Sequence, residues 1–181
     1  MNRTDERGMK AASRAMAVCG LCAALIVVLM TLGSAFGILT YVCPLLSGIL
    51  VLLVLENYGP KYALSLWGAS SLLALMLVPD REMAAVFAGI LGWYPIAKPH
   101  LDKLPRPIRP VCKGLIFNGT MVALYLALLY VLTPDVLGLG AGWENIVLLV
   151  MGNLILFLYD RALGRLTHTL LPRLNRLLPR N

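Results

Sequence analysis

The sequence predicts an all-α membrane protein with six transmembrane helices in one compact bundle over residues 1–160, followed by a cytoplasmic, basic amphipathic helix over residues 161–181. Of its 181 residues, 59% are apolar and 14% are charged, and the mean hydropathy is +0.79. This composition leaves too little polar surface for a soluble domain of that size. Six apolar stretches lie along the chain, and the Lys and Arg residues are concentrated in the two tails and in every second loop between the stretches.

Each apolar stretch approaches the ~20 residues that a helix needs to cross ~30 Å of hydrocarbon. The predicted spans are residues 16–33, 38–55, 62–79, 83–97, 111–132 and 145–159. The fourth span is the shortest, at about 15 residues. To cross the bilayer it must extend into its flanking residues, thin the bilayer locally or sit as a poorly tilted span.

The positive charges predict the orientation of the bundle. Fifteen of the 16 Lys and Arg residues lie in the two tails and in the second and fourth loops, and only Arg81 lies on the opposite side. Because Lys and Arg are retained on the cytoplasmic face, we expect a multi-pass cell-membrane protein with cytoplasmic N- and C-termini. The same distribution accounts for the net charge of +7. Nucleic acid is not expected as a partner, since no aromatic-interleaved basic module accompanies the charge.

The sequence gives no sign of an enzyme. It contains no pair of carboxylates suited to catalysis, no G-x-S-x-G elbow, no H-E-x-x-H helix and no P-loop. Cys19 and Cys22 have the C-x-x-C spacing, but they lie in an apolar helix without a nearby His, which favours a role as small buried residues. We therefore expect no catalytic residue, no metal and no cofactor, and the bilayer as the first partner.

Small residues recur at every fourth position of the first predicted helix, at Ala11, Ala15, Cys19 and Ala23. Such a line lets helix backbones approach closely in lipid, where the hydrophobic effect does not hold helices together. Two interpretations are open. The line can pack within the bundle, or it can dock an external partner, because it begins at the cytoplasmic boundary.

Several prolines and asparagines mark irregular or polar positions. Pro44 shares a helical face with Tyr41 and is expected to kink its span or to open it, which leaves a carbonyl for a neighbour or a ligand. Pro95 is expected to end the fourth span. The proline-rich residues 104–110 predict an extended basic strip that suits anionic headgroups or an acidic partner. Asn118 and Asn153 are most simply interhelical hydrogen-bonding residues.

Three short motifs accompany this layout: Leu77-Val78-Pro79, the turn Gly92-Trp93-Tyr94-Pro95-Ile96-Ala97-Lys98, and Tyr159-Asp160-Arg161. With six short spans and a small-residue line in the first helix, the chain resembles the substrate-binding S components of energy-coupling factor transporters. The motifs also resemble uncharacterised Gram-positive membrane proteins of that layout. The resemblance implies a small-molecule ligand, such as a vitamin or another micronutrient, together with a transmembrane coupling subunit and ATPase subunits as partners. It matches Ala11 and Ala15 to the contact motif for the coupling subunit.

The resemblance also implies a substrate pocket that opens to the outside. The candidate ligand-binding residues are those that the topology places outward or within the spans, namely Tyr41, Pro44, Asp80, Arg81, Glu82, Tyr125, Glu144, Asn145 and Asn153. For residues 80–82, ordinary loop charges are the alternative. A non-catalytic scaffold of the cell-envelope or cell-shape machinery is the alternative function, because small six-span proteins of that apparatus have a similar plan and need no ligand.

Overall fold

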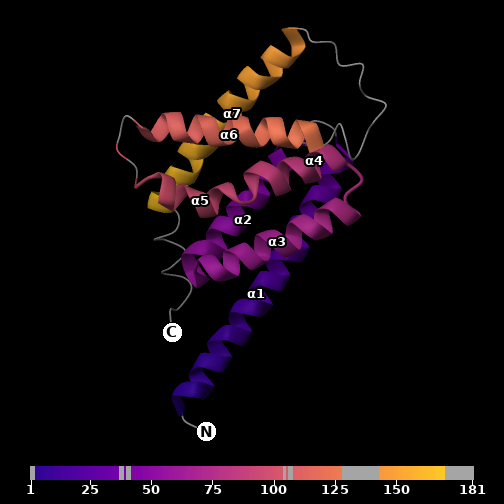
Figure 1. Cartoon of the computed structure of the whole chain (residues 1–181). Coiled ribbons are helices and arrows are strands. Elements are labelled where there is room, and N and C mark those ends of the chain that lie inside the picture. The colour runs from indigo at the N-terminus through magenta and orange to yellow at the C-terminus, as the bar shows by residue number, and fades with distance from the viewer. Residues whose placement is uncertain are drawn as a thin grey trace. The chain divides into compact units, whose positions relative to one another are not determined.

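The computed structural model (Figure 1) describes residues 3–36, 39, 42–103, 105, 108–127 and 143–169. Over these ranges the protein is helical and contains no strand, which confirms the all-α prediction for the described residues. The elements are α1 (Arg3–Ser34), α2 (Val42–Tyr58), α3 (Pro60–Leu77), α4 (Arg81–Val86), the π-helix η2 (Phe87–Leu91), α5 (Tyr94–Leu101), α6 (Ile108–Ala127) and α7 (Trp143–Thr169).

The arrangement of the helices in one six-span bundle remains a prediction. The chain divides into two compact units, Met1–Ala97 and Lys98–Asn181, called unit 1 and unit 2 here. In unit 1, α1 packs against both α2 and α3, and η2 packs against the same two helices. The core of this unit is formed by fully buried side chains that include Ile26, Met30, Val51, Leu66 and Phe87. Figure 1 shows the N-terminal part of α1 projecting beyond α2 and α3.

A glycine and a proline make the tight connection between α2 and α3. Gly59 has φ 92°, a left-handed conformation that costs glycine nothing, and its N–H donates to the carbonyl of Leu55 at 2.9 Å. Pro60 then opens α3, at a position where a helix needs no N–H donor. One residue therefore separates the two helices.

Pro44 does not kink or open a helix, contrary to the sequence-based expectation. α2 begins at Val42, so Pro44 lies in its first turn, where backbone N–H groups have no intrahelical partner to lose. The side chain is buried in unit 1. Tyr41, which was expected on the same face, lies outside the described residues.

The predicted fourth span, residues 83–97, is interrupted. It consists of α4, the π-helix η2, a turn at Gly92 and Trp93, and the start of α5. A π-helix displaces carbonyls from the regular pattern of the α-helix. Two indole N–H groups donate to carbonyls of this segment: Trp67 Nε1 to Ala88 O at 3.2 Å, and Trp93 Nε1 to Gly89 O. The tryptophans therefore stabilise the irregular segment.

Replacing Trp67 by Phe tests this role of the indole. The substitution keeps an aromatic ring and removes the donor to Ala88 O, so we expect a loss of about 1 kcal/mol in the free energy of unfolding. Thermal unfolding of the detergent-solubilised protein, followed by circular dichroism, measures the change. An unchanged midpoint would show that the carbonyl of Ala88 needs no donor.

Two further proline predictions are wrong. Pro95 does not end a helix but is the second residue of α5, and that helix continues through Pro99 to Leu101. Residues 104–110 are not an extended strip throughout, because α6 begins at Ile108 and includes Arg109 and Pro110. Pro95 and Pro110 both occupy a first helical turn, which tolerates proline. α5 begins one residue before Pro95 and α6 begins two residues before Pro110, so neither proline interrupts a helix.

Unit 2 contains α6 and α7, which pack against each other and cross in Figure 1. Gly152 of α7 permits the contact, because a Cβ there would lie 3.0 Å from Met121 Cε. α7 continues without a break through Asp160 and Arg161 to Thr169. The expected boundary between residues 160 and 161 therefore falls inside a continuous helix. The remainder of the predicted amphipathic tail lies outside the described residues.

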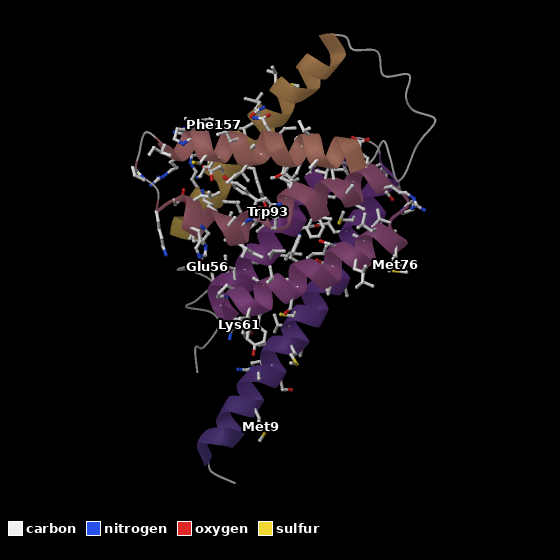
Figure 2. All side chains as sticks on the ribbon, viewed as in Figure 1. Met9, Glu56, Lys61, Met76, Trp93 and Phe157 are labelled. Atoms are coloured by element: carbon white, nitrogen blue, oxygen red, sulfur yellow. The ribbon has the colours of Figure 1, made fainter. Side chains whose placement is uncertain are left out.

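One described helix is long and apolar enough to cross a membrane, over Ala12–Ser34, and only 22% of its most apolar window is buried. α2 is apolar but shorter. Large apolar side chains are also exposed on other helices, including Met76 of α3 (76%), Leu115 of α6 (68%) and Phe157 of α7 (58%). Met76 and Phe157 are labelled in Figure 2.

Candidate functional site

Five charged side chains of unit 2 form one connected network of ion pairs. They are Lys98 of α5, Asp102 in the turn after it, Arg109 and Lys113 of α6, and Asp160 of α7. Lys98 and Asp102 are four residues apart, as are Arg109 and Lys113. Each pair therefore lies on one side of its segment and can meet the other.

Lys113 is the centre of the network. Its ammonium group donates to Asp102 Oδ1 at 2.7 Å and to both carboxylate oxygens of Asp160 at 2.9 Å. The residue is only 8% exposed. A buried ammonium group needs charged partners of this kind, because its desolvation is costly.

Lys98 and Arg109 complete the network from two sides. Lys98 Nζ donates to the carboxylate of Asp160 and, at 3.0 Å, to its main-chain carbonyl, and it lies 3.5 Å from Asp102 Oδ2. Arg109 Nη2 donates to the main-chain carbonyl of Asp102. Three cations thus share two carboxylates, which leaves one positive charge in excess.

Arg109 makes the fewest close contacts with hydrogen-bond acceptors among the three cations of the network. Its Nε lies 3.9 Å from Asp102 Oδ1 and, among the described residues, has no hydrogen-bond partner. Its side chain is 39% exposed, against 11% for Lys98 and 10% for Lys113. The excess positive charge is therefore most accessible at Arg109.

A second polar contact joins α6 and α7. Asn118 Nδ2 donates to Asn153 Oδ1 at 3.2 Å, and Asn153 Nδ2 donates to Asn118 Oδ1 at 3.0 Å. Asn118 also donates to the carbonyl of Gly114 at 2.8 Å. The predicted interhelical hydrogen bonding of these two residues is confirmed. Asn153, which was also a candidate ligand-binding residue, uses its side-chain amide in this reciprocal pair.

Two buried hydroxyl groups of unit 1 have no hydrogen bond to any residue that the structure describes. Ser47 of α2 is fully buried and Ser71 of α3 is 7% exposed, and neither Oγ has a hydrogen-bond partner among the described residues. Each residue stands twelve positions from Gly59, so the two hydroxyls lie at equal distances along the two helices from the turn. An unsatisfied buried hydroxyl costs about 1–3 kcal/mol.

The structure describes the side chains of only some of the predicted ligand residues, and these are divided between the two units. Asp80 is the N-cap of α4, and its carboxylate accepts from the N–H of Met83 at 3.0 Å, while Arg81 and Glu82 are exposed in the first turn of that helix. These three residues belong to unit 1, whereas Asn153 belongs to unit 2. Tyr125 lies on α6, and Glu144 and Asn145 lie in the first turn of α7, but their side chains are outside the described set.

The small-residue line of α1 is used inside unit 1. Ala15 is 2% exposed and Ala23 is 8% exposed. The sulfhydryl of Cys19 approaches the carbonyl of Tyr62 in α3 at 3.8 Å. These contacts favour internal packing over an external docking face. The side chain of Ala11 is outside the described set.

Comparison of the chain with protein-family models, with curated proteins and with solved structures found no match. In the described part of the chain, no group of three or more His, Cys, Asp or Glu side chains is arranged to hold a metal ion. The ion-pair network was missed by sequence reasoning, which treated Lys98, Arg109 and Lys113 as free cytoplasmic charges. The available signal was the presence of Asp102 and Asp160 on the side that carries most of the cations.

Proposed function

We propose that the chain is a multi-pass membrane protein that binds a small molecule and serves as the substrate-binding subunit of an uptake transporter powered by separate ATPases. The observation that carries this proposal is that the buried hydroxyls of Ser47 and Ser71 have no hydrogen-bond partner within the described part of the chain. A polar ligand that hydrogen-bonds to them would remove their desolvation cost. The vitamin-like class of ligand comes from the resemblance to S components.

The two hydroxyls differ from others in the described helices. A serine or threonine in a helix usually donates to a carbonyl three or four residues earlier. The hydroxyls that do so are those of Thr31, Ser34, Ser65, Ser70, Thr120 and Thr167. Ser71 directly follows Ser70 and makes no such bond. This contrast is what a ligand-facing hydroxyl would produce.

The exposed apolar surfaces support the membrane placement in this proposal. They occur on α1, α3, α6 and α7, which contribute to both units. Contact of these faces with lipid tails carries no free-energy cost, whereas their contact with water is unfavourable. The multi-pass topology with both termini in the cytoplasm is part of this proposal and rests on the charge distribution of the sequence.

Native mass spectrometry of the gently solubilised protein tests the proposal. We expect a small molecule that remains bound through purification and is lost from the Ser47→Ala and Ser71→Ala variants. Ser70→Ala is the matched control, because its hydroxyl is already bonded to Leu66 O at 2.7 Å. In the ligand-free state, Ser71→Ala should be at least as stable as the wild type, since it removes an unsatisfied group.

The result that contradicts the proposal is a wild-type protein that retains no small molecule, copurifies with no coupling subunit or ATPase, and supports no uptake when coexpressed with them. A Ser70→Ala variant that loses the ligand as completely as Ser71→Ala would also count against it.

A membrane scaffold is the second candidate, and the burial of Ala15 and Ala23 favours it. In this structure, α1 does not present these residues to a coupling subunit. Copurification with peptidoglycan-synthesising machinery, without a ligand, would support the scaffold over transport.

A further inference from the structure

We propose that unit 2 binds the headgroup of an anionic phospholipid at the exposed side of the ion-pair network, with Arg109 contacting the phosphate and Lys103 beside it. This inference rests on the membrane placement proposed above, but it does not depend on transport. The site is distinct from the hydroxyl pair of unit 1.

The charge balance of the network is the first step. Lys98 and Lys113 are nearly buried and make close contacts with both carboxylates. Arg109 donates to one main-chain carbonyl, and its nearest carboxylate oxygen lies 3.9 Å from Nε; that Nε is buried and has no hydrogen-bond partner among the described residues. Because the side chain is 39% exposed while Nε is buried, the terminal N–H groups of the guanidinium are the ones that can donate to phosphate oxygens, and they can do so without giving up a close ion pair.

The surroundings of Arg109 add positive potential. It lies in the first turn of α6, where the helix dipole is positive and no acidic residue occupies that turn. Its Nη2 donates to the carbonyl of Asp102, so the backbone of the next residue, the exposed Lys103, lies close to the guanidinium group. An anion bound here would meet two cations and the N-terminus of a helix.

The apolar neighbours of Arg109 indicate a lipid rather than a free anion. Ile108 is 48% exposed and Val111 is 58% exposed, and Leu115, one turn further along α6, is 68% exposed. Acyl chains can cover this face while the headgroup meets the charges at its end. A free phosphate would leave the apolar face uncovered.

The experiment uses the purified full-length protein in detergent. It is titrated with phosphatidylglycerol or with phosphatidylcholine of the same acyl chains, and bound lipids are counted by native mass spectrometry. We expect phosphatidylglycerol to bind at least about fivefold more tightly, and Arg109→Gln to reduce its affinity about fivefold without changing that of phosphatidylcholine. Arg109→Lys retains the charge but not the planar arrangement of N–H donors, and it should lose less phosphatidylglycerol affinity than Arg109→Gln.

Arg161→Gln is the matched control. Arg161 is exposed on α7, where its guanidinium carbon lies 5.7 Å from the centre of the Phe157 ring, and it is not part of the network. Its replacement removes the same charge and should change phosphatidylglycerol affinity less than about twofold. Circular dichroism establishes that each variant retains its helical content. If Arg109→Gln does not fold, Lys103→Gln is used instead and should weaken phosphatidylglycerol binding selectively.

Three outcomes would overturn the proposal: equal affinity of the wild type for both lipids, an Arg161→Gln variant that loses as much affinity as Arg109→Gln, or displacement of phosphatidylglycerol by millimolar inorganic phosphate. The last result would identify a free-anion site. None of these outcomes bears on whether the hydroxyls of unit 1 bind a ligand, so the two proposals can fail separately.

Discussion

Replacement of Asp160 by Asn should cost about 3 kcal/mol of folding free energy. The carboxylate accepts from Lys113 at 2.9 Å through both oxygens and also accepts from Lys98. Its loss leaves three cations with the single carboxylate of Asp102, and removal of one partner from a buried pair typically costs 3–5 kcal/mol. The lower end applies because Asp160 is 28% exposed. Thermal or denaturant unfolding in detergent, followed by circular dichroism, measures the change.

A paired substitution separates lost pairing from lost packing. The double variant Lys113→Met and Asp160→Leu removes both charges and should be more stable than Asp160→Asn, because no unpaired buried ammonium group remains at position 113. Glu56→Gln, at an exposed acid on α2, is the control and should change stability by less than about 0.5 kcal/mol. Equal stability of Asp160→Asn and the wild type would show that the network contributes nothing to folding.

Replacement of Gly33 by Ala should destabilise unit 1 by about 1–3 kcal/mol. A Cβ at this buried position of α1 would lie 2.3 Å from Cys43 Sγ and 3.0 Å from Cys43 Cβ, so the two helices would have to move apart. Unfolding of the detergent-solubilised variant is the measurement.

Two further variants test the steric cause. Gly33→Ala combined with Cys43→Ala removes the sulfur and should recover part of the lost stability, although the contact at 3.0 Å remains tight. Gly68→Ala is the matched control. Nothing lies within 4 Å of a Cβ there, and alanine is the better helix former, so this variant should be as stable as the wild type or more stable by about 0.5–1 kcal/mol. Equal losses for Gly33→Ala and Gly68→Ala would contradict the steric explanation.

The sequence was informative where local rules decide the structure. The helical content, a connection between residues 55 and 62, and interhelical hydrogen bonding by Asn118 and Asn153 were predicted from apolar periodicity and interhelical polarity, and the described residues confirm them. Each depends on short-range preferences, or on the need of an amide in an apolar setting for a partner.

Predictions failed where the outcome depends on where a helix begins or on which helices meet. Pro44, Pro95 and Pro110 were read as breaks or extended positions, but each lies within a first helical turn, and an error of a few residues in the helix start reverses the meaning of a proline. Asp102 and Asp160 lie 58 positions apart. Their common contact with Lys113 requires the packing of unit 2, which hydropathy and charge counting do not supply.

The continuous course of α7 has a mechanical consequence. Its 27 residues form a rod about 40 Å long, and the rod is held at Asp160 by Lys98 and Lys113. A tilt of residues 161–169 must pass into residues 143–159, since the helix contains no break to absorb it. α7 is also held to α6 by the Asn118–Asn153 amide pair, seven residues before Asp160, so the helix could rotate about either anchor only by breaking the contacts at the other.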